Sequence, residues 1–391
     1  MKKIVVLQSH PIQYHSPFYD LLSQQPNLKT IVYYCSNYGA DGNSFRMHPE
    51  VGKVPNWDIS LIDGHEHIFL ENNAPKPSIF NGFWGVINWR IFSQLRKDKP
   101  DYVLILGWNY FSLVYGALVC KLLGIKTVVR GDNTLQRDDK LIKGYKVILK
   151  KLLYGYMLFP LYTKVGYAGE SNRLFFKKYK VNDNQLVWLP HAVDNQRFYR
   201  SYLQNVPNKR TIRSGLGINS TDFVLLFVGR LIEDKKPADL LLSFKALKNA
   251  HLLIVGEGPY RADLEQIVEA HNIQNCHFLG FKNQTELTQY FSVADIFTLP
   301  SYMDTWGLVI NEAMNFKLPI LTTSFTGSAA NLVTPENGCT VAVGDVAAMT
   351  AFLKKLASNP DLRESMGEKS YEIVQEYSYE RLAQNLLALM A

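Results

Sequence analysis

The alternation of short apolar runs with helical segments constrains this chain more than any other feature. In the second half, apolar runs that fit buried strands are each followed by a segment with helical character. Strands separated by helices indicate a parallel sheet with crossover helices. The predicted strands are 223–228, 251–255, 277–279, 296–299 and 319–322, and the predicted helices are 236–246, 261–271, 285–291 and 309–315.

The first half shows the same alternation, so two similar open α/β sheets in tandem are predicted. At roughly 100–200 residues per domain, a length of 391 residues also fits two domains. A basic stretch with little apolar periodicity, 195–220, is the predicted linker, which places the domains at 1–195 and 196–375. The strands predicted in the first half are 3–7, 30–34, 102–106 and 127–129, and the helices are 18–22 and 112–123.

Composition places the chain among soluble globular proteins, because 47% of its residues are hydrophobic and 20% are charged. The net charge of +7 favours an anionic partner, but no basic stripe with interleaved aromatic residues supports nucleic-acid binding. The four cysteines lie far apart, which predicts single buried thiols rather than a zinc or redox pair. No run suits a signal peptide or a spanning helix, so we expect a cytoplasmic protein, with peripheral contact to the inner face of a membrane left open.

Two glycine-containing loops follow predicted strands of the second half. Gly229 and Arg230 come directly after 223–228, and Lys235 stands on the way to the next helix. A glycine there lets the backbone approach a ligand, and the two cations suit a diphosphate, although two exposed surface cations are the simpler interpretation. Gly256 and Gly258 follow the next strand, where doubly wound sheets bind ligands, but a plain strand-to-helix turn explains them equally well.

A third motif spans residues 304–312. Asp304 is expected in a loop and Glu312 in the helix that follows, and both carboxylates suit hydroxyl groups of a sugar and a ribose. Between them, residues 307–309 form a predicted helix N-terminus whose free N–H groups suit a phosphate. The alternative is an ordinary capped helix with Glu312 exposed.

In this order and spacing, the three motifs resemble the C-terminal domain of retaining GT-B glycosyltransferases of family 4, the group 1 transferases. The family's Gly-Arg-Leu…Lys element matches Gly229 to Lys235, its Gly-x-Gly-Pro loop matches Gly256 to Pro259, and its Glu-x7-Glu element matches Asp304 to Glu312. The resemblance is close over residues 185–385 and looser before them. It implies two Rossmann-like domains facing a cleft, with the C-terminal helix, 376–391, packing near or on the N-terminal domain.

The resemblance also implies roles for single residues. Arg230 and Lys235 would hold the donor diphosphate, Glu312 the ribose, and Asp304 the donor sugar, and the backbone near Phe281 would face the base. Arg230, Lys235 and Asp304 are the implied catalytic residues. The remaining implied donor-binding residues are Gly229, Gly256, Gly258, Trp306, Gly307, Leu308 and Val309.

Three positions depart from the family pattern. Asp304 stands where Glu is usual, Trp306 where Phe is usual, and Lys236 where Gly is common. The shorter side chain of Asp304 bears on the identity of the donor sugar. No Asp-x-Asp pair ends an apolar strand, so we expect the cations and the helix N-terminus to stabilise the diphosphate without a metal ion, and no cofactor is implied.

The loop after the first strand, residues 9–17, is rich in hydrogen-bonding groups. In this fold it faces the cleft, which makes His10, Gln13 and His15 candidates for the acceptor site, with either histidine conceivable as a general base. Histidines that satisfy the local loop backbone are the competing interpretation. Asp132 is a further cleft candidate, close to a place where many relatives carry a histidine that this chain lacks.

Residues 140–164 mix lysines with Leu, Ile, Tyr and Phe. A basic amphipathic helix of this kind is suited to an anionic membrane surface. Pro160 and the even spread of apolar residues favour a core helix with one solvated face instead.

These observations favour a metal-independent enzyme that transfers a hexose-type sugar from a nucleotide-sugar donor, preferably a UDP-sugar, to an acceptor hydroxyl. Retention of configuration is implied by the family alone. The acceptor would be a glycan, a lipid-linked sugar or a small molecule, in glycan, polysaccharide or glycolipid synthesis. The alternative is a non-catalytic nucleotide-sugar-binding subunit, suggested by Asp304 and the missing histidine, whereas nucleic-acid binding rests on charge alone and is disfavoured.

Overall fold

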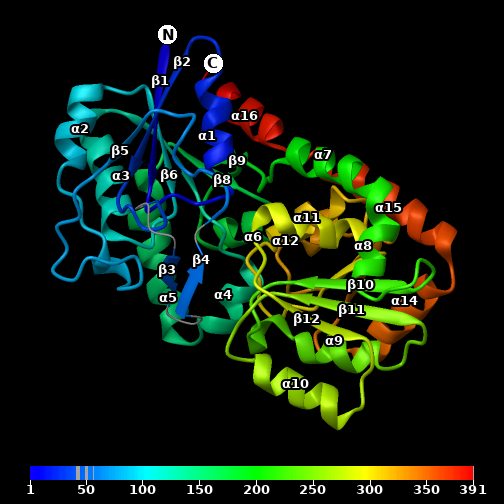
Figure 1. The fold of residues 1–391 in the computed structure, drawn as a ribbon. Coiled ribbons are helices and arrows are strands. Elements are labelled where there is room, and N and C mark those ends of the chain that lie inside the picture. Colours follow the sequence, from blue (N-terminus) through cyan, green and yellow to red (C-terminus); the bar gives the residue numbers. More distant parts are fainter. Residues whose placement is uncertain (41–44, 49–51, 56, 391) are drawn as a thin grey trace. The chain divides into compact units, whose positions relative to one another are not determined.

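The computed structural model describes residues 1–40, 45–48, 52–55 and 57–390. The chain divides into two compact units, one formed by residues 1–190 together with 379–391 and the other by residues 191–378 (Figure 1). Each unit is built around its own parallel sheet, so both are Rossmann-like α/β domains.

The N-terminal unit contains a seven-stranded parallel sheet in the order β5-β2-β1-β6-β7-β8-β9. Its strands are β1 Lys2–Gln8, β2 Leu28–Tyr34, β5 His67–Phe69, β6 Tyr102–Leu106, β7 Lys126–Arg130, β8 Lys164–Tyr167 and β9 Leu186–Trp188, beside an antiparallel pair of β3 Phe45–His48 and β4 Gly52–Pro55. Its helices are α1 Ser16–Ser23, α2 Ile91–Asp98, α3 Phe111–Leu123, α4 Leu135–Leu141, α5 Tyr145–Leu152, α6 Glu170–Lys178 and α16 Tyr379–Ala388. Helix α5 continues into a π-helical turn, η2 Leu153–Leu158, and a 3-10 turn, η3 Phe159–Leu161.

The middle of this sheet is apolar on both faces, as parallel strands covered by helices require. Residues Ile4 to Leu7 of β1 are almost fully buried. Helix α3 packs closely on β1, since a Cβ atom at Gly116 would lie 2.4 Å from the side chain of Leu7. The glycine therefore sets how near the helix can approach the strand.

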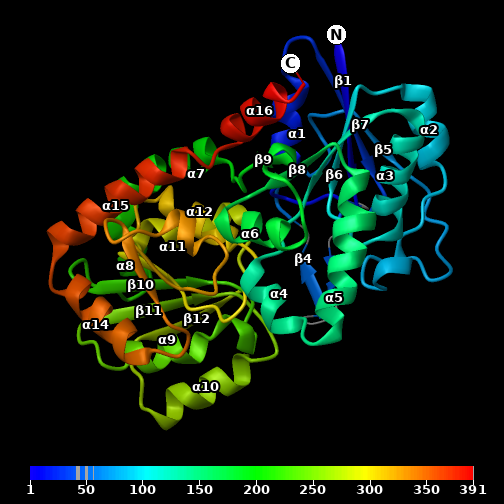
Figure 2. The same cartoon turned by 180° about the vertical axis from the view of Figure 1, so that it is seen from behind.

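Helix α16, at the end of the chain, completes the N-terminal unit and lies beside α1 (Figure 2). Leu382 and Leu386 are buried on its inner face. The hydroxyl of Tyr379 donates to the carbonyl of Tyr14 at 2.9 Å, and the amide of Asn385 donates to the carbonyl of Trp188 at 3.0 Å. The helix is thus held by both apolar packing and hydrogen bonds.

The C-terminal unit contains a six-stranded parallel sheet in the order β12-β11-β10-β13-β14-β15. Its strands are β10 Phe223–Val228, β11 Ala250–Val255, β12 Cys276–Gly280, β13 Ile296–Leu299, β14 Ile320–Thr323 and β15 Gly338–Val341. Its helices are α7 Asn195–Asn205, α8 Lys209–Gly215, α9 Pro237–Phe244, α10 Arg261–Ala270, α11 Gln284–Val293, α12 Leu308–Met314, α13 Ala329–Leu332, α14 Val346–Ala357 and α15 Pro360–Gln375. Helices α9 and α10 lie on one side of the sheet, and α8, α11 and α12 lie on the other (Figure 1).

The strand and helix predictions are confirmed, and the main errors concern the linker and the stretch 140–164. The linker prediction at 195–220 is wrong, because this stretch forms α7 and α8 and belongs to the C-terminal unit. Arg213 of α8 is buried, donates to the carbonyl of Val293 at 2.7 Å and pairs with Asp295 at 2.8 Å. Polar contacts of this kind replace the apolar periodicity that would have identified the helix.

The interpretation of 140–164 as a core helix is wrong for α5, whereas Leu158, Phe159 and Tyr162 at the end of this stretch are buried in the core. Helix α5 has no buried residue, and several of its large apolar side chains are exposed. None of the described helices combines the length and apolar character needed to cross a bilayer. Of the four cysteines, which are all free thiols, Cys35 and Cys120 are buried as predicted, whereas Cys276 and Cys339 are half-buried.

Candidate functional site

Three loops of the C-terminal unit begin at the carboxyl edge of its sheet. Strand β10 pairs in parallel with β11 on one side and with β13 on the other. The loops that follow these strands, 229–236, 256–260 and 300–307, carry the three sequence motifs. Loops at this edge are where open α/β sheets bind their ligands.

The two glycine-containing loops are packed against each other through their backbones. The N–H of Gly229 donates to the carbonyl of Val255 at 3.0 Å, and that of Leu231 donates to the carbonyl of Glu257 at 3.0 Å. A Cβ atom at Gly256 would lie 1.9 Å from the carbonyl oxygen of Gly229, and one at Gly258 would lie 2.3 Å from that of Leu231. Close contact between the two loops therefore requires both glycines, quite apart from any ligand.

Two other positions of the first loop differ from this pattern. Gly229 stands where a side chain would fit, and Lys236 stands where the backbone favours glycine. A Cβ atom at Gly229 would meet only the ring of Phe227, at an ordinary 3.4 Å. Lys236 has φ of +49° and precedes α9. Glycine adopts this left-handed conformation most easily, so the backbone at Lys236 favours glycine. The lysine ammonium pairs with Glu233 at 3.3 Å and lies 5.6 Å from the ring centre of Tyr302.

Lys235 and Asp304 join two of the loops. The ammonium of Lys235 donates to Oδ2 of Asp304, and both side chains are largely buried. The other carboxylate oxygen of Asp304 accepts from the N–H of Trp306 at 3.4 Å. The backbone of Asp304 is held in turn by Phe325 and Gly327. Arg230 stands exposed on the same loop as Lys235, so the predicted diphosphate cations lie on one loop.

Glu312 lies inside the C-terminal unit. It is 2% exposed, so the interpretation of an exposed helical carboxylate is wrong. Gly307 precedes α12 with φ of +83°, and Leu308 and Val309, the first residues of this seven-residue helix, are half-buried. Their N–H groups have no intrahelical acceptor.

Trp306 and Phe281 complete the predicted donor site. The indole of Trp306 is buried, donates to Oδ1 of Asn311 at 2.9 Å and contacts the rings of His191 and Tyr377. The side chain of Trp306 therefore packs in the interior of the unit, and a ligand at this loop would contact the backbone of Trp306 and not its indole. Phe281 follows β12 and is half-buried.

The predicted acceptor residues lie in the N-terminal unit. Burial lowers the pKa of His10 to about 4, and its Nδ1 lies 3.0 Å from the hydroxyl of Ser9. Burial, with smaller contributions from the charges of Arg130 and His10, lowers the pKa of His15 to about 3. Both imidazoles are therefore neutral at pH 7 and poor proton acceptors, which weighs against either as an efficient general base. Gln13 is half-buried and Asp132 is exposed.

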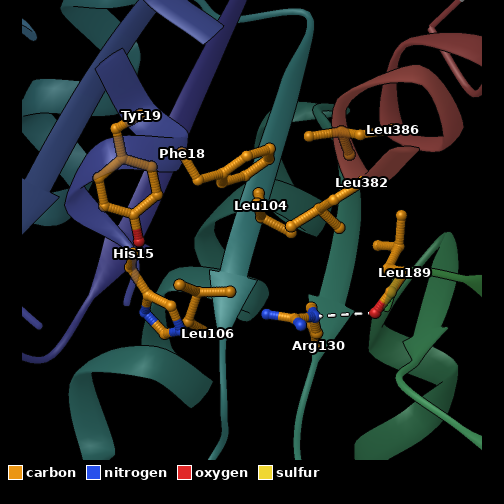
Figure 3. A pocket seen from close by; sticks show the side chains of 9 residues that line it. All are labelled: His15, Phe18, Tyr19, Leu104, Leu106, Arg130, Leu189, Leu382 and Leu386. Atoms are coloured by element: carbon orange, nitrogen blue, oxygen red, sulfur yellow. Dashed lines mark hydrogen bonds between the residues drawn. The ribbon is translucent and has the colours of Figure 1, made fainter. Parts of the chain in front are cut away.

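A small cavity beside His15 is lined by Arg130, a buried residue that the sequence analysis did not identify. Its walls come from α1, β6, the end of β7, the chain after β9, and α16 (Figure 3). Arg130 ends β7 there and donates to the carbonyls of Leu189 at 3.1 Å and Pro190 at 2.7 Å. Burial lowers its pKa to about 10, so it stays charged at neutral pH. The only sequence signal was a cation at the end of an apolar strand. The lining side chains are His15, Phe18, Tyr19, Leu104, Leu106, Arg130, Leu189, Leu382 and Leu386.

Within the residues that the structure describes, no three His, Cys, Asp or Glu side chains are grouped so as to hold a metal ion. At this edge of the sheet lie the cations Arg230 and Lys235, the carboxylate of Asp304, which pairs with Lys235, and backbone groups of the three loops. Such a set suits an anionic ligand with hydroxyl groups.

The family model for "Glycosyl transferases group 1" matches residues 208–373, which include all three loops. These residues are a group 1 glycosyltransferase domain. The group 1 domain lies within the C-terminal unit, and its boundaries enclose α8 through most of α15.

The curated relatives that match this chain are distant. The chain is 25% identical over 217 residues to the capsular polysaccharide biosynthesis glycosyltransferase CapM of Staphylococcus aureus, a match that covers 54% of this chain and 50% of CapM. It is 26% identical over 293 residues to the alpha-monoglucosyldiacylglycerol synthase of Acholeplasma laidlawii, which covers 71% of this chain and 69% of the synthase. The match thus spans about half the length of the first of these relatives.

Solved structures resemble the whole chain in fold. A glycosyltransferase from Rickettsia africae has a TM-score of 0.76 at 14% identity, covering 99% of this chain and 97% of that one. Anabaena HepE in complex with UDP has a TM-score of 0.75 at 13% identity, covering 100% and 99%. The fold is therefore that of the GT-B glycosyltransferases.

Proposed function

We propose that this protein is a glycosyltransferase that moves a hexose-type sugar from a nucleotide-sugar donor, a UDP-sugar, to an acceptor hydroxyl with retention of configuration. The observation that carries the proposal is the contact between Lys235 and Asp304. It joins the loop with the diphosphate cations to the loop that precedes Glu312. Backbone contacts attach the loop 256–260 to the first of these loops, so the three parts of the donor motif share one edge of the sheet.

The residues of this edge suit the departure of a nucleoside diphosphate. Arg230 and Lys235 would stabilise the charge that develops on the leaving oxygen, an interaction that is stronger in the transition state than in the ground state. Glu312 would accept hydrogen bonds from the ribose hydroxyls. The leaving diphosphate would take the proton of the acceptor hydroxyl, so no dedicated base is needed, in keeping with the low pKa values of His10 and His15.

Asp304 has two tasks in this scheme. Its carboxylate orients the ammonium of Lys235, and in the proposed complex it would also accept a hydrogen bond from a hydroxyl of the donor sugar. The pairing with Lys235 and the contact with the sugar would compete for the same carboxylate. The side chain of Asp is also one methylene shorter than that of the usual Glu, so it reaches less far toward the sugar. The cations supply the electrostatic stabilisation in this scheme, and no step is assigned to a metal ion.

The activities of similar proteins support the proposed class of substrate. HepE was solved with UDP and with UDP-glucose, and the relatives named above act in capsular polysaccharide and diacylglycerol glycolipid synthesis. We therefore propose a polysaccharide intermediate or a glycolipid as acceptor.

The test begins with donor identity. Thermal unfolding with UDP-, GDP- and ADP-sugars should reveal one class that raises the melting temperature, since a ligand specific for the native state stabilises it. With that donor, Arg230→Ala should lower sugar transfer or release about 100-fold or more. Glu312→Gln, which keeps the shape of the buried side chain, should weaken donor binding.

Arg210→Ala provides the matched control, because Arg210 is an exposed arginine of the same unit on α8. Full activity of both Arg230→Ala and Glu312→Gln would overturn the assignment. Donor binding without any turnover, including slow hydrolysis, would instead identify a nucleotide-sugar-binding subunit.

A further inference from the structure

Helix α5 presents an apolar face to solvent. The exposed fractions of Tyr145, Ile148, Leu149 and Leu152 are 74%, 65%, 61% and 51%. At about 100° per residue, these four side chains fall within one sector of roughly 100°. We call this sector the α5 face. Soluble proteins rarely leave so many large apolar side chains together in water without a partner.

Lysines flank the α5 face on both sides. By the same geometry, Lys146 and Lys151 lie about 60° outside the sector in opposite directions, and both are exposed. Residues 140–169 contain six lysines and no Asp or Glu. An apolar stripe bordered by lysines is the pattern of helices that lie in the interface of an anionic membrane, where lysine ammonium groups reach the headgroups.

The opposite side of α5 is firmly attached to the N-terminal unit. The ammonium of Lys150 pairs with the buried carboxylate of Asp138 and lies 5.0 Å from the ring centre of Tyr154. The hydroxyl of Tyr154 accepts from the indole of Trp108 at 3.2 Å. These contacts on the opposite side of α5 fix the orientation of the helix, so the α5 face points to solvent.

The exposed apolar surface continues beyond α5. In the π-helical turn η2, Tyr156 and Met157 are exposed. Lys121 of α3 donates to the carbonyl of Pro160 at 3.4 Å, which brings the end of α3 next to η3, the turn that follows η2. Leu118 and Leu122, on the same end of α3, are exposed as well.

We propose that the α5 face docks this protein on an anionic lipid bilayer. The apolar side chains enter the boundary between headgroups and acyl chains, and Lys146 and Lys151 contact anionic headgroups. A second copy of the chain fits less well, because face-to-face pairing would bring the flanking lysines of the two copies together. The inference goes beyond sugar transfer and does not depend on it.

Cosedimentation with vesicles tests the proposal. The protein should bind vesicles of phosphatidylglycerol and phosphatidylcholine and should bind pure phosphatidylcholine at least tenfold more weakly. Ile148→Glu/Leu152→Glu should lower the partition coefficient about tenfold or more through the apolar term. Lys146→Glu/Lys151→Glu should lower it by a similar factor through the electrostatic term, and for the unchanged protein binding should fall as salt is raised.

Leu203→Glu is the matched control, because Leu203 of α7 is 54% exposed, like Leu152. It should bind vesicles as the unchanged protein does, and all variants should keep their melting temperature. Equal binding by Ile148→Glu/Leu152→Glu and the unchanged protein would overturn the proposal, as would absence of binding to anionic vesicles. A dimer in sedimentation analysis that only Ile148→Glu/Leu152→Glu abolishes, without vesicle binding, would assign the face to a second copy. Donor binding, measured separately, reports on the proposed function alone.

Discussion

Gly256 and Gly258 illustrate how a motif that predicts ligand binding can be required by packing. Both sequence and family resemblance associate this loop with the donor. In the structure, each glycine is required by a carbonyl oxygen of the preceding loop, which a Cβ atom would displace. The motif therefore fixes the loop of Arg230 and Lys235 in place.

Gly258→Ala should therefore destabilise the C-terminal unit. Inserting a methyl group against backbone forces a shift of the loop, with an expected loss of about 1–3 kcal/mol in the free energy of unfolding. Urea unfolding of the variant measures this loss. Gly215→Ala is the control, since a Cβ atom there meets nothing within 4 Å, and it should leave stability unchanged or slightly higher. Equal stabilities of the two variants would contradict the packing role.

At the scale of elements, the start of α1 shows how burial alters a histidine. His15 precedes α1 at its N-cap position, and its side chain does not cap the helix. It lies instead beside the cavity and near the charge of Arg130. The sequence pattern of a polar loop after a strand could not distinguish a solvated histidine from a buried neutral one.

The low pKa of His15 predicts a pH-dependent stability. In the unfolded chain the pKa of His15 is about 6.5, so its imidazole binds a proton below this pH. In the folded chain the imidazole stays neutral down to about pH 3. The contribution of His15 to the free energy of unfolding is therefore fully present above pH 6.5. It is lost as the pH falls, by up to about 1.4 kcal/mol per pH unit. His10 acts in the same direction, with a pKa of about 4.

His15→Asn should flatten this dependence between pH 6.5 and 5, as measured by urea unfolding at several pH values. The slope should fall by about 1 kcal/mol per pH unit. His271→Asn, at an exposed histidine of the C-terminal unit, should keep the slope of the unchanged protein. An unaltered slope in His15→Asn would show that this imidazole is solvated in the folded chain.

At the scale of the whole molecule, the two units differ in how the chain builds them. The C-terminal unit, 191–378, is one continuous segment. The N-terminal unit needs the last helix of the chain, and α16 supplies Leu382 and Leu386 to its interior. The stability of the first unit thus depends on residues that are separated from the rest of it by the whole C-terminal unit.

Leu386→Ala should destabilise the N-terminal unit by about 2–5 kcal/mol, because it removes a nearly fully buried side chain. Amide hydrogen exchange should accelerate in α1 and β1, while β10 and β11 keep their protection. Gln384→Ala, at an exposed position on the same helix, should change neither. Faster exchange in β10 instead of β1 would contradict the assignment of α16 to the first unit.

The sequence by itself determined the fold class, most strands and helices of both sheets, and the three motifs of the group 1 domain. These features depend on residues close together along the chain, such as the apolar run of β10 and the glycine and cation that follow it. Hydrophobic periodicity and turn chemistry report such local structure directly.

Only the tertiary structure decided which side chains are buried and which loops meet. The pairing of Lys235 with Asp304, the burial of Glu312, the contacts of Arg130 and the outward apolar face of α5 all join or separate residues far apart in sequence. The same amphipathic pattern in 140–164 fits a core helix or a membrane-facing one. The choice between them lies in what packs against Lys150, and no local pattern contains that information.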